Sequence, residues 1–317
     1  MGWRYRPGGK NGGAHAITGV VGTERRRPSR GYWRAAGTLR HTAQTVTKLR
    51  VDLSRKLRVP SGRQFALKAA AASHTHRWEE SAARVESSLL AGKLEKLQYK
   101  LHADGRYGVL VVLQAIDGGG KDSTIRHVFS AFNPQGCTVH SFKAPSSEEL
   151  QHDYLWRVHA HTPPRGELAV FNRSHYEDVL IARVDKLVPR RVWQARYHQI
   201  NEFERMLVES NIRVVKIFLN ISKDEQRRRF ADRMHERHKQ WKFDPEDLVK
   251  RRQWNQYQRA FADMLGRCST AHAPWYVVPA NHKWLRDLAV AQILYATLQS
   301  LALRFPRPRF NPRTRIS

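Results

Sequence analysis

One stretch decides the fold, and it reads Gly108-Val109-Leu110-Val111-Val112-Leu113-Gln114-Ala115-Ile116-Asp117-Gly118-Gly119-Gly120-Lys121-Asp122-Ser123-Thr124. Residues 108–113 form a continuous apolar run, which is typical of a strand buried on both faces of a parallel sheet. A glycine-rich turn follows and leads into an expected helix. Such a turn lets backbone N–H groups approach phosphate oxygens, and the helix N-terminus adds free N–H groups and a positive dipole end. The stretch therefore predicts a phosphate-binding loop.

The loop departs from the strict Walker pattern GxxxxGK[ST] at two positions. Ala115 replaces the first glycine, and Asp122 replaces the hydroxyl residue that binds Mg²⁺. Lys121 keeps a positive charge at the loop. The alternative interpretation is a glycine-rich turn in which Ser123 or Thr124 caps the helix and no ligand binds. We favour phosphate binding, with candidate contacts from Gly118, Gly119, Gly120, Lys121, Asp122, Ser123 and Thr124.

Asp117 lies inside the loop, where a carboxylate repels bound phosphates unless a cation lies between them. Mg²⁺ prefers oxygen ligands and commonly joins one or two carboxylates to substrate phosphates. Asp117 is therefore the candidate metal ligand. The alternative is an ordinary aspartate of a turn.

A second polar cluster follows the expected strand 168–171 and reads Asn172-Arg173-Ser174-His175-Tyr176-Glu177-Asp178. Polar residues at the carboxyl end of a parallel strand face the crevice where ligands bind. Arg173 is able to hold a phosphate through two parallel hydrogen bonds, and the alternative is a surface ion pair with Glu177. Asn172 occupies the usual place of a Walker-B aspartate. Its amide could hold a metal-bound water without adding charge.

Residues 223–242 are strongly basic. Arg229, Arg233 and Arg237 recur at i, i+4 and i+8, so one helix face is expected to carry a row of guanidinium groups. A solvated face is the usual explanation for such a run, but few acids balance this one. We therefore predict a mobile helical lid, at about 223–250, that brings cations onto a transferring phosphoryl group and excludes water.

Strands and helices are expected to alternate along the rest of the chain. Apolar residues at helical spacing predict a first helix over 82–102. The alternation indicates an α/β fold, a P-loop kinase-like three-layer α/β/α arrangement with a parallel sheet and a helical lid. The expected strands are 108–113, 137–142, 168–171, 214–219 and 275–278. The other expected helices are 121–132, 147–160, 191–209, 223–237, 245–266 and 283–301.

The charge balance points to an anionic partner. The chain of 317 residues has 56 Lys and Arg against 28 Asp and Glu, a formal net charge of +28. Nucleic acid, an acidic membrane surface and a polyanionic substrate are the candidates. Two widely separated cysteines indicate a reduced, cytoplasmic protein, and no apolar run approaches the length of a membrane span. We expect a basic disordered extension over 1–45 and a basic tail over 306–317.

Taken together, these motifs resemble the second family of polyphosphate kinases, which are relatives of the nucleoside monophosphate kinases. The resemblance spans about Leu53 to Arg304 and implies a single catalytic domain over 46–305. It rests on the segments Asp117-Gly-Gly-Gly-Lys-Asp, Asn133-Pro-Gln-Gly, Phe142-Lys-Ala-Pro, His152-Asp-Tyr-Leu-Trp-Arg, Phe171-Asn-Arg-Ser-His-Tyr-Glu-Asp-Val-Leu, Gln240-Trp-Lys-Phe and Ala273-Pro-Trp.

The resemblance implies Mg²⁺-dependent phosphoryl transfer between polyphosphate and a nucleotide, with the metal held by Asp117. The implied catalytic residues are Asp117, Lys121, Arg173 and Arg183. The implied polyphosphate path includes Lys143, Arg157 and the lid residues Arg229, Arg233 and Lys242. The implied nucleotide contacts are Asn172, His175 and Glu177. Segment 172–178 is similar to the subgroup that accepts AMP as well as ADP. The expected partners are polyphosphate, ADP/ATP or AMP, guanine nucleotides as a further option, and a second copy of the chain in a homo-oligomer.

Two other functions stay open on the sequence. An ATP-dependent nucleotide kinase would share the loop and the lid, and a comparison of ATP with polyphosphate as donor separates it. A non-catalytic nucleic-acid-binding protein would account for the charge of +28. It would not account for Asp117, since a carboxylate beside a phosphate path weakens binding when no metal is present.

Overall fold

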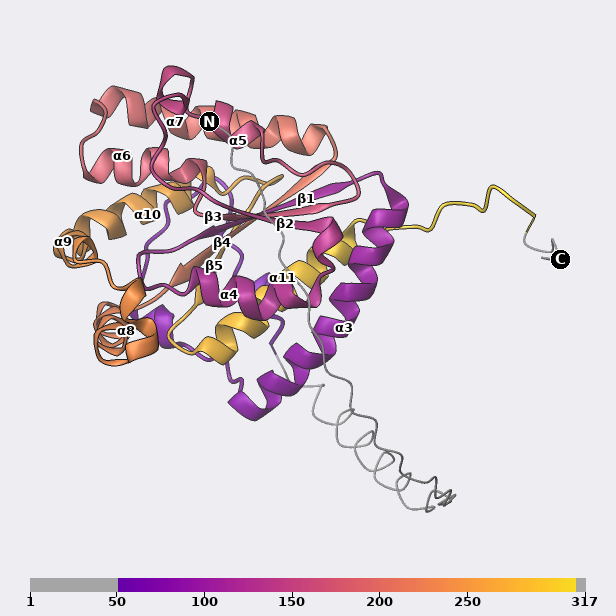
Figure 1. Ribbon diagram of the computed structural model, residues 1–317, viewed down its shortest axis with the longest axis horizontal. Helices are drawn as coiled ribbons and strands as arrows, with labels where there is room; N and C mark the ends of the chain where they lie inside the picture. The colour runs from indigo at the N-terminus through magenta and orange to yellow at the C-terminus, as the bar shows by residue number, and fades with distance from the viewer. Residues whose placement is uncertain (1–50, 312–317) are drawn as a thin grey trace, which may run out of the picture. The chain divides into compact units, whose positions relative to one another are not determined.

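The computed structural model describes residues 51–311. The predicted extension over 1–45 and the end of the predicted tail lie outside the described residues. The described chain contains a five-stranded, all-parallel sheet in the order β2-β3-β1-β4-β5 (Figure 1). Its strands are β1 (Gly108–Gln114), β2 (Cys137–Ser141), β3 (Leu168–Asn172), β4 (Ile212–Asn220) and β5 (Trp275–Pro279). All five predicted strands are confirmed.

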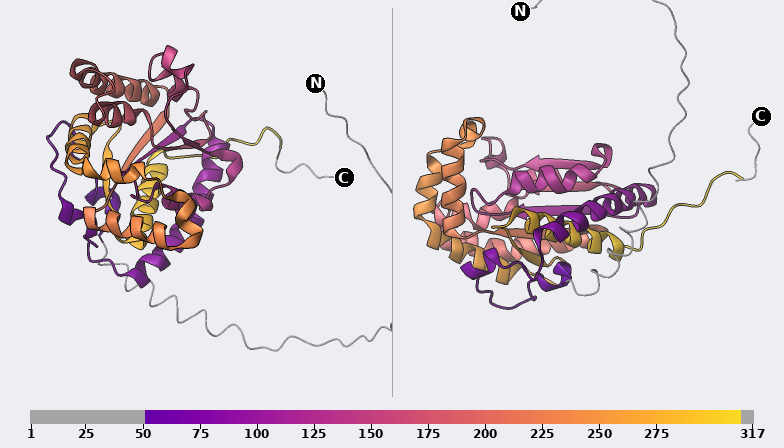
Figure 2. Two further views of the ribbon diagram at one scale, coloured as in Figure 1. Left: turned by 60° about the vertical axis from the view of Figure 1, so that its left-hand side comes forward. Right: turned by 90° about the horizontal axis from the view of Figure 1, so that it is seen from below.

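Helices cover both faces of the sheet (Figures 1 and 2). One face carries α3 (Glu80–Asp104), α4 (Lys121–Val128) and α11 (Lys283–Ser300), with α2 (Leu53–Lys56) against α11. The other carries α6 (Ile181–Val184), α7 (Arg190–Glu209) and α10 (Trp254–Cys268). The predicted lid segment forms α8 (Lys223–His235), η7 (Arg237–Lys242) and α9 (Glu246–Arg252) at one end of the sheet. Shorter pieces are η2 (Ala69–Ser73), η3 (Phe129–Ala131), η4 (Pro134–Gly136), η5 (Glu149–Gln151), α5 (Trp156–His159) and η6 (His175–Val179). This is the predicted three-layer arrangement.

The surroundings of the central strand, β1, explain why its sequence is a continuous apolar run. Every residue of β1 is buried, because β3 and β4 pair with it on either side and helices cover both faces. On α3, Leu90, Leu94 and Leu101 are buried, whereas Leu89 is exposed. No helix in the described part of the chain is long and apolar enough to cross a lipid bilayer.

The predicted helix over 147–160 is wrong, because the structure has only the short η5 and α5 there. Between them, the Asp153 carboxylate accepts a hydrogen bond from the Leu155 N–H at 2.9 Å. A side chain that captures a nearby backbone N–H in this way competes with the helix ladder. His152 is extended, with φ −105° and ψ 174°. The local hydrogen bond of Asp153, rather than the spacing of apolar residues, therefore determines the backbone structure of this segment.

Two further predicted helices have different limits. The helix expected over 245–266 is two helices, α9 and α10, which meet at Gln253. The helix expected over 223–237 ends at His235, because Glu236 is extended with ψ 108°. Arg237 consequently belongs to η7 and does not continue the row of Arg229 and Arg233 on one helix face.

A charged cluster is buried between α7, β4 and η6. Lys216 Nζ donates to Glu204 Oε2 at 2.5 Å, to the Tyr176 hydroxyl at 2.9 Å and to the Cys268 carbonyl at 2.6 Å. Glu204 Oε1 also accepts from the Tyr176 hydroxyl and lies 3.3 Å from His175 Nε2. Burial alone would raise the pKa of Glu204, but the Lys216 charge holds it below its usual range. The cluster anchors η6, the segment that directly follows Arg173.

We expect Lys216→Met to lower the free energy of unfolding by about 3–5 kcal/mol, because the variant leaves the Glu204 carboxylate buried without its cation. Urea denaturation at neutral pH measures the change. The control is the double variant Lys216→Met/Glu204→Gln, which removes both charges and should lose less stability. If the single and double variants lose equal stability, the uncompensated charge is not the cause.

Candidate active site

A cleft of about 1580 Å³ opens where β1, β2 and β3 end. The cleft is lined by residues 117–123 after β1, by residues 141–145 at the end of β2, and by Asn172, Arg173, Glu177 and Asp178 at the end of β3 and in the turn that follows. Residues of α8, η7 and α9 also line it. Lys121 of the loop and Arg233 of the lid segment line this same cleft, as the lid prediction requires.

The loop between β1 and α4 has the backbone that its glycines permit. Gly118 has φ +78° and Gly120 has φ +99°, both in the region that side chains disfavour. Lys121 is buried, and its Nζ donates to the Ala115 carbonyl at 3.0 Å. Burial lowers the pKa of Lys121, and the nearby Arg173 charge lowers it further. A partly desolvated ammonium at this point gains strongly from an anionic ligand.

Asp117 and Arg173 form an ion pair across two strand ends. Arg173 Nη2 donates to Asp117 Oδ1 at 2.7 Å. Burial alone would raise the pKa of Asp117, but the positive charges of Lys121 and Arg173 hold it below its usual range. The Arg173 backbone is left-handed, with φ +63°, and its N–H donates to the Leu113 carbonyl at 3.2 Å. A non-glycine residue in this conformation is strained, and such strain gathers at functional sites.

Asn172 connects the loop to the neighbouring strand ends. Its Nδ2 donates to Asp122 Oδ1 at 2.8 Å and to Ser141 Oγ at 3.3 Å. Its Oδ1 is buried and has no hydrogen-bond partner. Because buried polar atoms are almost always paired in proteins, this oxygen points to a ligand or water at the site.

Glu177 lines the cleft behind Arg173. Burial raises the pKa of Glu177, although the charges of Arg173 and Lys121 act against the rise. A carboxyl group whose ionised form is disfavoured by burial thus lies beside the cationic loop.

Lys143, Arg157, Arg233 and Lys242 also line the cleft, as the sequence predicted. Arg157 Nη1 donates to the Lys143 carbonyl at 3.0 Å and lies 3.3 Å from Glu149 Oε2. Arg233 Nη1 donates to Asp247 Oδ2 of α9 at 3.1 Å. These arginines thus have protein partners while they face the cleft.

Three predicted site residues are placed elsewhere. His175 and Thr124 are buried and are not among the described residues that line the cleft. His175 faces Glu204, and the Thr124 hydroxyl donates to the Gly120 carbonyl at 3.0 Å as part of the helix start. Arg183 turns toward α10, where Nη1 donates to Asp263 Oδ2 at 2.6 Å. The direction of a side chain in a short turn such as η6, which holds His175, has no reliable sequence pattern. Thr124 and Arg183 lie on α4 and α6 instead, so their directions depend on how these helices pack.

Sequence reasoning also missed cations that the fold brings into the cleft. The missed cleft cations are Arg126, Arg196, Lys239, Lys250, Lys283 and Arg286. Lys239 and Lys250 lie inside the predicted lid, so a signal for them existed. For Lys283 and Arg286 the available signal was positive charge in the first turn of a helix, where it opposes the helix dipole.

The parallel sheet, the glycine-rich loop and the basic cleft define a P-loop kinase-like phosphotransferase. The chain belongs to the polyphosphate kinase 2 family, because the model described as Polyphosphate kinase 2 (PPK2) matches residues 77–305. The family resemblance and the enzyme class predicted from the motifs are confirmed.

Individual relatives agree with this assignment. The chain is 50% identical over 256 residues to an AMP/ADP-polyphosphate phosphotransferase of Meiothermus ruber, covering 80% of this chain and 96% of the relative. It is 45% identical over 226 residues to an ADP-polyphosphate phosphotransferase of Rhodopseudomonas palustris, covering 68% and 78%. The crystal structure of Polyphosphate Kinase 2 from Arthrobacter aurescens TC1 is similar with a TM-score of 0.79 and 39% identity, covering 82% of this chain and 93% of that chain.

The raised pKa of Glu177 gives a pH-dependent prediction. Above this pKa the folded state holds a half-buried, ionised carboxylate that the unfolded chain hydrates freely. The cost disappears as the pH falls through the raised pKa. We expect Glu177→Gln to raise Tm at about pH 8 and to raise it less at about pH 5. Thermal melts of both proteins at the two pH values measure this; a gain that is larger at the acidic pH would contradict it.

Proposed function

We propose that the protein transfers the terminal phosphoryl group between inorganic polyphosphate and a nucleoside mono- or diphosphate, with AMP and ADP as the first candidates. The observation that carries the proposal is that Lys121 of the loop and Arg233 of α8 line one basic cleft. The printed names of the relatives, which include AMP/ADP-polyphosphate phosphotransferase, support the same substrates.

Charge favours polyphosphate as one of the substrates. The cleft is lined by cations from the loop, from the segments after β2 and β3, and from the lid. A basic groove binds and steers a linear chain of phosphates by the electrostatics that hold a nucleic acid backbone. We propose that Lys143, Arg157, Arg233 and Lys242 contact this chain, and that Asn172 and Glu177 contact the nucleotide.

The residues present fit a Mg²⁺ ion that is shared with the substrates. No group of three or more His, Cys, Asp or Glu in the described chain is arranged to hold a metal alone. Mg²⁺ sites in phosphoryl-transfer enzymes instead use one or two carboxylates, substrate phosphates and waters. Asp117 would hold the ion, and the unpartnered Asn172 Oδ1 could bind one of its waters. When bound, Mg²⁺ offsets negative charge on the phosphate oxygens.

The proposed mechanism relies on positioning and charge neutralisation. The attacking atom is a phosphate oxygen that is already ionised, so the reaction needs no strong base. Lys121 and the N–H groups at the start of α4 would hold the transferring phosphoryl group, and Arg173 would offset its charge while keeping Asp117 in place. Closure of the lid would exclude water, which would otherwise hydrolyse the donor. Arg183 has no part, since it faces α10.

Three further expectations stay proposals. We propose that residues 46–305 form the catalytic domain with a lid at about 223–250, that the protein is cytoplasmic, and that it forms a homo-oligomer.

The direct test incubates the protein with Mg²⁺ and long-chain polyphosphate and, separately, AMP, ADP, GMP or GDP, and separates the products by chromatography. We expect ADP and ATP from AMP and ADP. Transfer from ATP but not from polyphosphate would favour a nucleotide kinase. Gel-shift binding of nucleic acid without any transfer would favour a binding protein.

The variant Lys121→Ala should lower kcat by at least about 10²-fold, because it removes a charge that acts on the transferring group. Its circular dichroism spectrum should be unchanged.

Arg233→Ala should raise the KM for polyphosphate severalfold and lower kcat less, because Arg233 faces the cleft from the lid side and adds one charge to the path. Initial rates at varied polyphosphate concentration measure both constants. Arg205→Ala is a matched control, because Arg205 is an exposed arginine of α7 that pairs with Glu202 and does not line the cleft. An unchanged KM in the Arg233 variant would exclude the lid contact.

A further inference from the structure

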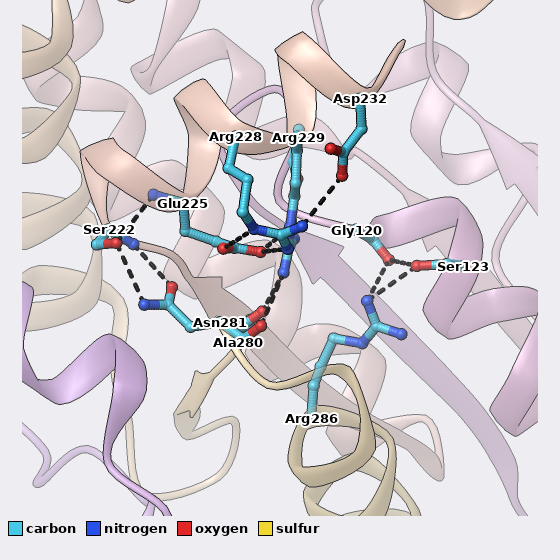
Figure 3. Close-up of polar contacts among 11 residues, drawn as sticks. Gly120, Ser123, Ser222, Glu225, Arg228, Arg229, Asp232, Ala280, Asn281 and Arg286 are labelled. Atoms are coloured by element: carbon cyan, nitrogen blue, oxygen red, sulfur yellow. Dashed lines mark hydrogen bonds and ion pairs between the residues drawn. The ribbon is translucent and has the colours of Figure 1, made fainter. Parts of the chain in front are cut away.

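Two arginines from remote helices hold the phosphate-binding loop through its own polar groups (Figure 3). Arg229 of α8 donates from Nη1 to the Gly118 carbonyl at 2.9 Å. Arg286 of α11 donates from Nη1 to Ser123 Oγ at 2.8 Å and lies 3.4 Å from the Gly120 carbonyl. The loop is therefore supported from both sides by guanidinium groups that are not part of it.

Arg286 is built tightly into this position. It is fully buried, and its Nε donates to Asp287 Oδ1 at 2.8 Å. Its Nη2 lies 2.7 Å from the same oxygen as an ion pair but makes no hydrogen bond within the described chain. A methyl group on Gly120 would lie 2.4 Å from Arg286 Nη1, so the guanidinium occupies the space that the glycine leaves open. The contact thus depends on the absence of a side chain at the same residue whose φ of +99° already favours glycine.

A positive charge at the position of Arg286 is electrostatically unfavourable. Arg286 lies in the first turn of α11, where a positive charge opposes the helix dipole. Burial lowers the pKa of Arg229, and the nearby Arg286 charge lowers it further, although Glu225 acts against the shift. Burial lowers the pKa of the neighbouring Lys283, and the Arg229 charge lowers it further. Asp287 is the one acidic residue that Arg286 contacts in the described chain.

Arg229, which the resemblance gives as a polyphosphate contact, lines the cleft and is held just as firmly by protein partners. Nε donates to Glu225 Oε1 at 2.7 Å, and Nη2 donates to the Ala280 carbonyl. The Ser222 N–H donates to Asn281 Oδ1 at 3.0 Å, which ties the start of α8 to the turn before α11 (Figure 3). All three guanidinium nitrogens of Arg229 therefore have protein partners.

Arg286 reaches the loop backbone at the Gly120 carbonyl, both directly and through Ser123. The Ser123 hydroxyl accepts from Arg286 and donates to the Gly120 carbonyl at 2.9 Å. In a trans peptide the Lys121 N–H points away from that carbonyl. This N–H is also among the first of α4, which have no partner within the helix. Fixing the Gly120 carbonyl consequently fixes a donor that is free to meet a phosphate.

We propose that Arg286 is a positioning residue: it holds the Ser123 hydroxyl and the Gly120 carbonyl so that the Lys121 N–H and the loop are set for the transferring phosphoryl group before substrate binds. The inference rests on the proposed function. Preorganised donors of this kind act most strongly in the transition state, because they need no rearrangement during the reaction.

The test compares Arg286→Ala, Ser123→Ala and the double variant with the wild type. We expect kcat of Arg286→Ala to fall by about 10- to 100-fold and the KM for polyphosphate to rise only severalfold, since most of the lost interaction acts in the transition state. Millimolar guanidinium chloride should restore part of the rate, and equal NaCl should not. Because Arg286 and Ser123 act on the same Gly120 carbonyl, the losses of the two single variants should not add in the double variant. Additive losses, or an unchanged kcat in a folded variant, would overturn the proposal.

Arg228→Ala is the matched control. Arg228 belongs to the same group in Figure 3 and pairs with Glu225 and Asp232, but it contacts no loop atom. A loss of rate in this variant as large as that of Arg286→Ala would show a general structural effect and overturn the proposal. If Arg286→Ala does not fold, Asp287→Asn releases the Arg286 orientation more gently and should lower kcat in the same direction; an unchanged rate would count against the role.

Calorimetry with tripolyphosphate separates this inference from the proposed function. We expect Arg286→Ala to bind this probe severalfold more weakly, with guanidinium restoring the affinity. A wild type that binds tripolyphosphate but transfers nothing would reject the proposed function alone, and the affinity comparison would still test Arg286. Equal affinity in the two proteins, or no binding by the wild type, would overturn the inference.

Discussion

The parallel pairing of β1 with β3 is the constraint on which the site depends. Its register places Leu113 beside Asn172, so the loop after one strand and the polar turn after the other begin at the same level of the sheet. Arg173 then needs only a left-handed backbone to reach Asp117 at 2.7 Å. Because both strands are buried, a shift of this register would move apolar side chains out of the core. The register therefore fixes the backbone positions from which Arg173 and Asp117 form their ion pair.

The site also has to keep several cations close together before any anionic substrate arrives. It does so with backbone carbonyls as well as with carboxylates. Lys121 donates to Ala115, Arg229 to Gly118 and Ala280, and Arg286 reaches Gly120 directly and through Ser123. Arg173, Arg229 and Arg286 also pair with Asp117, Glu225 and Asp287. A carbonyl dipole satisfies a donor without cancelling its charge, so these contacts hold the loop without neutralising Lys121, which suits a reaction catalysed by charge neutralisation.

The two kinds of sequence pattern differed in how well they predicted structure. The continuous apolar run over 108–113 predicted β1, because a strand buried on both faces tolerates few polar residues. β2 has no such run, and its residues are exposed or half-buried. Helical spacing failed over 147–160, where Asp153 captures a backbone N–H that a helix would use. Strand-end position correctly predicted cleft-facing Asn172, Arg173 and Glu177, but it could not distinguish them from His175, which turns inward to Glu204. A turn has no fixed period from which the direction of each side chain could be inferred.

By itself, the sequence determined the loop, the strand before it and the helix after it, because the glycines, Lys121 and the apolar run act over a few neighbouring residues. It also determined the family, through several separated motifs. Only the tertiary structure decided which cations serve the site. Arg286 and Lys283 line the cleft, whereas Arg183 pairs with Asp263 of α10, a pairing that the sequence around Arg183 does not indicate. The reason is that the sheet order and the packing of α11 and α10 are set by contacts between residues far apart in the chain.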